Sequence, residues 1–218
     1  MAKLHLVIGN KNYSSWSLRP WMALTMAHIP FDETVIPLYQ PQSSKLICEH
    51  SAAGKVPILH HGKITVWESL AILEYLADAF PERKLWPGGK AARAAARSAA
   101  TEMHSGFVAL RNACPMNLRR PCKAIAMSEA VRTDVARIDA LWRQCRNAHG
   151  RKGRFLFGPF SNADAMFAPV VTRFNTYDVK VSGESRAYME AVLATPAFKT
   201  WEKAAREEPW TIPREEIE

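Results

Sequence analysis

Strand-type and helix-type patterns alternate over roughly the first eighty residues, and this alternation then stops. Residues 3–9 and 32–38 have the β-branched, apolar composition of strands, and residues 17–27 between them have helical spacing. A strand, a helix and a second strand in this order predict a parallel pair joined by a right-handed crossover.

The remainder of this region predicts a short helix or irregular turn, a hairpin and a further helix. Residues 43–51 form the first of these, and residues 56–61 and 64–68 flank a Gly-containing turn. Residues 69–80 repeat apolar side chains at helical spacing. The predicted order is therefore βαβαββα, which describes a small α/β domain over residues 1–81.

Residues 82–90 contain the proline and glycine punctuation of a linker. The chain beyond it, residues 91–218, is predicted to form an all-helical domain. The expected helices cover residues 91–111, 128–148, 161–175, 185–194 and 197–207.

Composition and charge narrow the class of protein. The net charge of +8 comes from scattered lysines and arginines without a dense basic stripe or a nucleic-acid reading motif, so we expect no nucleic-acid partner. No apolar run is long enough to span a membrane, and the N-terminus lacks the pattern of a signal peptide. These features predict a cytoplasmic protein that attracts small anions through its positive charge.

Four scattered cysteines, Cys48, Cys114, Cys122 and Cys145, lack the spacing of a metal site. We expect no metal and free thiols, as in a reducing compartment. Cys114 and Cys122 share one proline-punctuated stretch, so a reactive thiol there stays an alternative.

Ser161 and Asp164 have the spacing of a helix capping box. The Ser161 side chain can accept from the backbone N–H of residue 164, and the Asp164 carboxylate can reach back to the N–H of Ser161. Because apolar residues follow, we expect Asp164 to be a buried structural cap rather than a catalytic acid.

Three separated segments are expected to converge in the α/β domain. They are the serine-rich turn at 14–19, the stretch 55–59, and residues 68–70 at the start of a helix. Pro57 cannot donate to a sheet ladder, and if its peptide bond is cis, Val56 would turn its backbone toward an incoming extended peptide. Helix N-termini stabilise anions, so Ser69 could hold a ligand carboxylate and Glu68 a ligand ammonium. The alternative for Ser69 is a plain helix cap.

These segments together resemble the cytosolic glutathione S-transferase family, closest to its zeta-like, serine-type bacterial members. SSWSLR at 14–19 is similar to the zeta-class SSCSxR run, and residues 54–59 and 67–76 are similar to the family's "VP" and "ES" stretches. The resemblance implies a thioredoxin-like glutathione-binding domain (1–81), a linker (82–90) and a helical substrate-binding domain (91–218). It also implies detoxification, a homodimer, and glutathione as co-substrate.

The resemblance implies roles for individual residues. Glu68 and Ser69 would hold the γ-glutamyl end of glutathione, Val56 with Pro57 would pair with its cysteinyl backbone, and Lys55 would lie near its glycyl end.

Ser14 would face the thiol, with Ser15 and Tyr13 as competing hydroxyls. A thiol titrates near pH 8.5, so a hydroxyl donating to sulfur at the positive end of a helix would favour the thiolate. Arg19 could add positive potential, although a structural ion pair is an equal alternative.

Trp16 stands where the zeta class has cysteine, which weakens the case for that class's isomerase activity. A pocket for the electrophile is expected where the helical domain faces the serine turn. Its candidates are Trp16, Met103, His104, Phe107, Arg111 and Met116. The apolar ones could instead belong to the core, and His104 could be a structural histidine.

The primary hypothesis is conjugation of glutathione to a small electrophile. A second is glutathione-dependent cis–trans isomerisation of a maleylacetoacetate-type substrate. A third is a non-catalytic member that binds a ligand or partner and has lost the chemistry.

Overall fold

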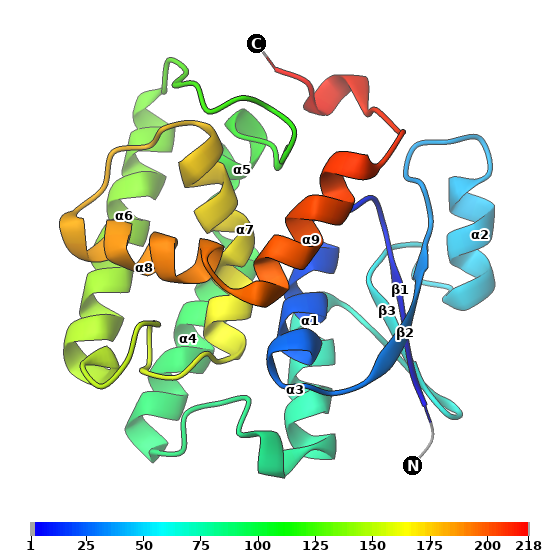
Figure 1. Ribbon diagram of the computed structural model, residues 1–218, viewed down its shortest axis with the longest axis horizontal. Helices are drawn as coiled ribbons and strands as arrows, with labels where there is room; N and C mark the ends of the chain where they lie inside the picture. Colours follow the sequence, from blue (N-terminus) through cyan, green and yellow to red (C-terminus); the bar gives the residue numbers. More distant parts are fainter. Residues whose placement is uncertain (1–2, 218) are drawn as a thin grey trace.

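A computed structural model describes residues 3–217, and it begins with a small α/β domain (Figure 1). The predicted order βαβαββα is confirmed. Its elements are β1 (Leu4–Ile8), α1 (Ser15–Met26), β2 (Phe31–Val35), α2 (Ser43–His50), β3 (Ile58–His61), β4 (Ile64–Trp67) and α3 (Ser69–Ala79).

The four strands form one sheet in the order β2-β1-β3-β4. β1 pairs parallel with β2 and antiparallel with β3, and β3 and β4 form the predicted hairpin. Because side chains alternate along a strand, β1 contributes Leu4, Leu6 and Ile8 to the large core and Val7 to a smaller cluster with Ile47 of α2. The sheet therefore lies between α1 and α3 on one face and α2 on the other (Figure 1).

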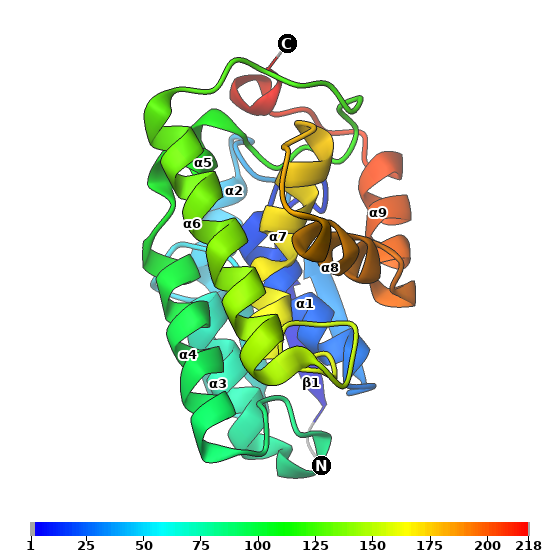
Figure 2. The same cartoon turned by 90° about the vertical axis from the view of Figure 1, so that its left-hand side faces the viewer.

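A helical domain follows a short 3-10 helix, η1 (Pro81–Arg83). Its elements are α4 (Lys90–Ser105), α5 (Val108–Ala113), α6 (Glu129–Cys145), a π-helical turn η2 (Arg146–Gly150), α7 (Asn162–Thr176), α8 (Gly183–Leu193), α9 (Pro196–Glu207) and the 3-10 helix η3 (Pro213–Glu215). α7 is almost wholly buried and packs against both α1 and α4 (Figure 2). This contact joins the helical domain to the helix that carries the serines.

The capping box at the start of α7 is present as predicted. The Asp164 carboxylate accepts from the Ser161 N–H at 2.8 Å, the Ser161 hydroxyl at 2.9 Å and the Leu156 N–H at 3.0 Å. Burial raises the pKa of Asp164 to about 6, against the effect of these donors. The residue is a structural cap, as expected.

The prediction of one helix over residues 91–111 is wrong. α4 ends at Ser105, Gly106 is extended, and Phe107 has a positive φ of 56° before α5 begins. A Cβ on Gly106 would lie 2.7 Å from the Glu102 carbonyl oxygen, so the turn depends on glycine there. A single glycine in a helical pattern did not reveal this break.

The end of the chain returns to the α/β domain. α9 packs against α1, and residues 208–217 then pass beside the loop between β1 and α1 (Figure 1). Among the described residues, no helix is long and apolar enough to cross a membrane.

Candidate functional site

The serine turn lies between β1 and α1. Ser14 is the N-cap residue of α1 and Ser15 its first helical residue, two residues earlier than the predicted helix start. The Ser14 side chain makes no capping hydrogen bond, and both serines are more than nine-tenths buried. The Ser14 hydroxyl therefore lies at the N-terminus of α1 but does not cap the helix.

Ser17 is the partner of Ser14. Their hydroxyl oxygens lie 2.7 Å apart, and the Ser17 oxygen also accepts from the Gly9 N–H at 3.1 Å. If the Ser17 hydroxyl donates to Ser14, the Ser14 hydrogen is free to point at a ligand. Ser17 lies in the serine-rich turn at 14–19, and no separate role was predicted for it from the sequence. Its position one helical turn after Ser14 was the available signal.

Tyr13 has a different environment. Its hydroxyl accepts from Arg119 Nη2 at 2.6 Å and donates to a carboxylate oxygen of Glu216. Both hydrogen-bonding directions of the phenol are thus in use. Of the three predicted hydroxyls, that of Tyr13 is the one whose donor and acceptor are both used by other protein side chains.

A cleft of about 520 Å³ opens beside this turn. Its walls come from the serine turn, the segment after β2, α2, the loop before Pro57, the region around α5 and α7, and the C-terminal segment. The lining residues are Tyr13, Ser14, Ser15, Trp16, Leu38, Tyr39, Gln40, Ser43, Ser44, Ile47, Gly54, Lys55, Val56, Arg111, Asn112, Met116, Arg173, Ile212, Arg214 and Glu215.

Lys55 and Val56 line the same cleft as the serine turn. The Val56–Pro57 peptide bond is cis, and Pro57 itself is buried behind it. Within residues 3–217, no hydrogen bond is made to the backbone N–H or C=O of Val56. An extended ligand in the cleft would therefore meet a main chain that has its donor and acceptor available.

Glu68 and Ser69 lie at the start of α3 and do not line this cleft. Glu68 has a φ of 70°, a conformation that is costly for a residue with a Cβ and is often kept at ligand sites. Ser69 is fully buried, and its hydroxyl has no hydrogen-bond partner among the described residues. Such a hydroxyl at a helix N-terminus can donate to a carboxylate that reaches it.

Trp16 connects the cleft to the helical domain. The Arg19 guanidinium carbon lies 4.0 Å and that of Arg111 5.4 Å from the Trp16 ring centre, and the His104 ring is edge-on at 5.3 Å. His104 Nε2 is in turn 3.9 Å from a Glu68 carboxylate oxygen. The tryptophan therefore lies between two cations instead of in an apolar pocket.

Arg19, Arg111 and Arg173 are held by backbone carbonyl groups. Arg19 donates to the carbonyl oxygens of Ser15 and Met166, which excludes the structural ion pair considered from sequence. In the part of the chain that the structure describes, none of the three arginines forms a salt bridge with a carboxylate. No direct ion pair therefore neutralises their positive charge, although Glu68 and Glu215 act on Arg19 and Arg173 from a greater distance.

Burial and mutual repulsion act on these guanidinium groups. Burial, Arg173 and Arg111 lower the pKa of Arg19 well below its usual value. Burial and Arg111 lower the pKa of Arg173 to about 10, so it stays protonated at neutral pH. The arrangement can stabilise an anion in the cleft. Arg173 was not among the residues predicted from the sequence, although a lone arginine within the apolar pattern of α7 is a signal that could have identified it.

Two residues predicted to line the electrophile pocket do not reach the cleft. Met103 is completely buried in the core, and Phe107 is buried at the turn between α4 and α5. The alternative considered from sequence, that apolar side chains at helical spacing belong to the core, applies to both. Met116 and Arg111 do line the cleft, while His104 contacts it through Trp16.

The cysteines are free, and Cys114 is buried. Burial raises the pKa of the Cys114 thiol to about 11, which argues against a reactive thiol there. Residues 3–217 contain no cluster of three metal-ligating side chains with suitable geometry.

Comparison with known proteins finds similarity to glutathione S-transferases in part of the sequence. Residues 13–79 match the family model described as "Glutathione S-transferase, N-terminal domain". The chain is 31% identical over 120 residues to glutathione S-transferase 1 of Dianthus caryophyllus, covering 53% of this chain and 52% of that protein. It is 31% identical over 99 residues to a probable maleylacetoacetate isomerase of Caenorhabditis elegans, covering 45% and 46%. The chain thus spans about half the length of the relatives it matches.

The similarity of the fold extends over nearly the whole chain. A glutathione transferase homologue from Burkholderia GL BGR1, whose structure contains bound glutathione, superposes with a TM-score of 0.72 at 22% identity. The alignment covers 94% of this chain and 100% of that one. The α/β domain followed by a helical domain is therefore the fold of glutathione transferases.

Proposed function

We propose that this protein is a glutathione S-transferase that joins the thiolate of glutathione to electrophilic small molecules. The observation that carries the proposal is the Ser14 hydroxyl, which lies at the N-terminus of α1, makes no helix cap and lines the cleft. The match of residues 13–79 to the glutathione S-transferase N-terminal domain supports the same conclusion.

Ser14 would act by donating a hydrogen bond to sulfur. Lowering a thiol pKa by about two units requires about 2.7 kcal/mol of preferential stabilisation of the anion. A hydrogen bond to a charged group together with a helix N-terminus supplies an amount of that size. The positive charges of Arg19, Arg111 and Arg173, which form no salt bridge among the described residues, act in the same direction.

The reaction begins when the thiol proton leaves to solvent. The sulfur lone pair then forms a bond to the electrophilic carbon, and the leaving group departs with the electron pair of its former bond. Ser14 hydrogen-bonds the nucleophile and does not itself attack, with Ser15 as the second candidate. Tyr13 is less suited, because Arg119 and Glu216 already engage its hydroxyl.

Glutathione would extend from the start of α3 to Lys55. Ser69 and Glu68 would hold its γ-glutamyl end, and the unpaired Ser69 hydroxyl is a donor for the carboxylate there. Val56, before the cis Pro57, would pair with the cysteinyl backbone, and Lys55 would neutralise the glycyl carboxylate.

A second candidate reaction is glutathione-dependent cis–trans isomerisation of a maleyl-type dicarboxylate. It is favoured by Arg111 and Arg173, which line the cleft without carboxylate partners among the described residues. One relative is named a probable maleylacetoacetate isomerase. In this reaction the thiolate adds, the carbon–carbon bond rotates, and the sulfur leaves again.

We further propose that this protein is a zeta-like, serine-type member of the glutathione S-transferase family. It would act in detoxification, in the cytoplasm and as a homodimer. The support is the SSWSLR run at 14–19 and the resemblance to the cytosolic enzymes. The electrophile would enter beside Trp16, Arg111 and His104.

Titration calorimetry with glutathione tests the proposal first. We expect binding at or below millimolar concentration, and no binding at that concentration would favour a non-catalytic protein. Rates with a chlorinated nitroaromatic and with a maleyl-type substrate then separate conjugation from isomerisation. Binding without either reaction would contradict both enzymatic proposals.

A further inference from the structure

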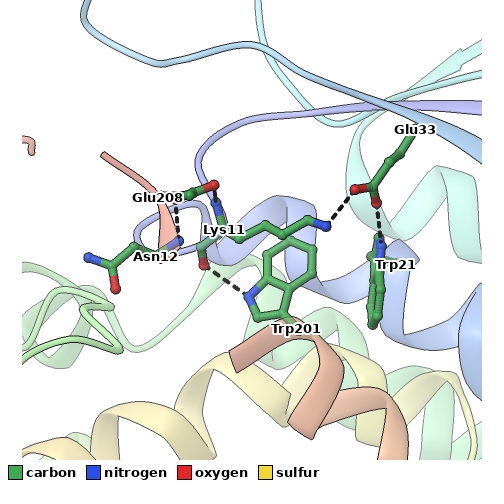
Figure 3. Close-up of polar contacts among 6 residues, drawn as sticks. All are labelled: Lys11, Asn12, Trp21, Glu33, Trp201 and Glu208. Carbon is green, nitrogen blue, oxygen red and sulfur yellow. Dashed lines mark hydrogen bonds and ion pairs between the residues drawn. The ribbon is translucent and has the colours of Figure 1, made fainter. Parts of the chain in front are cut away.

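The loop between β1 and α1 is held by a carboxylate from the other end of the chain. One oxygen of Glu208 accepts from the Lys11 N–H at 2.6 Å, and the other accepts from the Asn12 N–H at 3.0 Å (Figure 3). Two consecutive amides thus bind one side chain that is 196 and 197 residues away.

α9 places Glu208 at this position. Glu208 is the C-cap residue of α9, and the helix is anchored by Trp201, which is fully buried. The Trp201 indole N–H donates to the Lys11 carbonyl oxygen at 2.9 Å (Figure 3). The Lys11 main chain is therefore held through its donor by Glu208 and through its acceptor by Trp201.

The Lys11 side chain fixes the loop from a third direction. Its ammonium pairs with Glu33 at 2.5 Å and lies 5.5 Å from the ring centres of both Trp21 and Trp201 (Figure 3). The Trp21 indole N–H donates to the same Glu33 carboxylate at 2.7 Å. The loop is thus tied to β2, α1 and α9 together.

Glu208 is not well placed to stabilise its own helix. A carboxylate at the carboxyl end of a helix is repelled by the helix dipole. Burial raises the pKa of Glu208, while the N–H groups of Lys11 and Asn12 oppose that rise. The main consequence of its two hydrogen bonds is therefore the geometry that they impose on the loop.

The loop held by Glu208 continues directly into the serine turn. The Asn10 carbonyl oxygen accepts from the N–H of Tyr13 at 3.2 Å and from that of Ser14 at 2.8 Å. Lys11 and Asn12 are the two residues between Asn10 and Tyr13, so they form the part of the backbone that this turn encloses just before α1 begins.

We infer that Glu208 is a positioning residue for Ser14, which orients the serine hydroxyl toward the thiol through the loop formed by residues 10–13. This inference rests on the proposed binding of glutathione in the cleft. It gives the C-terminal segment a role in activating the thiol without contact to substrate.

The experiment compares three variants of the full-length protein. Glu208→Ala removes both acceptors, and Glu208→Gln keeps one acceptor oxygen in a side chain of the same shape. Glu207→Ala is the matched control, because Glu207 is exposed, adjacent and of the same charge. The readouts are the pKa of bound glutathione, followed by thiolate absorbance, and hydrogen exchange of the Lys11 and Asn12 amides without ligand.

We expect Glu208→Ala to raise the bound thiol pKa by about one unit, a tenfold loss of thiolate below the pKa. Glu208→Gln should give a smaller rise and Glu207→Ala none. If Glu208→Ala does not fold, Glu208→Gln carries the comparison. An unchanged thiol pKa in a Glu208 variant that still binds glutathione would overturn the inference.

Hydrogen exchange separates this inference from the proposed function. Faster exchange of the Lys11 and Asn12 amides is expected in the Glu208 variants, even if the wild type does not bind glutathione. Absence of glutathione binding by the wild type would overturn the proposed function and the role in thiol activation. Unchanged hydrogen exchange of the Lys11 and Asn12 amides in the Glu208 variants would show that Glu208 does not hold this loop.

Discussion

The hydroxyl oxygens of Ser14 and Ser17 lie 2.7 Å apart at the start of α1. Ser17 also accepts from the Gly9 N–H, which fixes its oxygen against the end of β1. The two serines thus form a short chain in which Ser17 can donate to Ser14 and Ser14 to a bound sulfur.

Replacing these serines one at a time should raise the pKa of the glutathione thiol by amounts that differ between the variants. Ser14→Ala should raise it by about one to two units, because the sulfur loses a direct donor. Ser17→Ala should raise it by roughly half a unit, because it acts only through Ser14. Titration of thiolate absorbance measures both, and Ser15→Ala should have the smallest effect. If the pKa of bound glutathione were unchanged in both Ser14→Ala and Ser15→Ala, the proposed mechanism would be wrong.

Replacing Ser69 should weaken glutathione binding without lowering stability. The buried hydroxyl has no partner in the described chain, so its removal from the free protein loses no hydrogen bond. Ser69→Ala should raise the dissociation constant about tenfold, equivalent to about 1.4 kcal/mol, while the melting temperature stays the same or rises. Calorimetry and thermal unfolding test the two parts. Unchanged affinity would place the γ-glutamyl end elsewhere.

Replacing Arg111 should distinguish anionic from neutral electrophiles. Arg111 lines the cleft and has no salt-bridge partner among the described residues, so an anionic substrate would gain from its charge. Arg111→Leu should raise KM for a maleyl-type substrate about tenfold and change KM for a neutral chlorinated aromatic by less than about threefold. Arg93→Leu, at an exposed position of α4, is the matched control. Equal losses for both substrates would point to a structural role.

Asp164 should make stability depend on pH in an identifiable window. Its folded-state pKa is raised to about 6, so between about pH 4 and 6 the folded state binds more protons than the unfolded state. This contribution to stability is present at low pH and is lost as the pH rises through 6, by up to about 3 kcal/mol. Asp164→Asn removes the ionisation.

The measurement is the free energy of unfolding of both proteins at several pH values. From pH 4 to 7 the wild type should lose stability relative to Asp164→Asn. Taking the difference between the two proteins cancels the contributions of all other titrating groups, which both proteins share. A constant difference would show that the Asp164 pKa is not raised. Asp164→Ala should be less stable than Asp164→Asn at every pH, because the N–H groups of Ser161 and Leu156 lose their acceptor.

Local patterns were enough to predict the order βαβαββα, the hairpin closed at Gly62 and the helical second half. Alternation and helical spacing record which faces are buried, and the Ser161–Asp164 box is formed by residues three apart. Such features depend on neighbours in the chain and are therefore legible in the sequence. The break at Gly106 and Phe107 was not predicted, because one glycine does not interrupt the helical pattern of 91–111. Nothing in the residue type of Phe107 marks the positive φ of 56° that it adopts.

Tertiary structure decided which side chains serve the site. The Tyr13 hydroxyl is engaged by Arg119 and Glu216, which are 106 and 203 residues away in the chain. Over residues 3–217, the Ser14 hydroxyl has only Ser17 as its partner. The hold of Glu208 on Lys11 and Asn12 likewise joins the two ends of the chain. Partners so distant are brought together only by the packing of α9 and α7 on α1, which no local pattern of residues encodes.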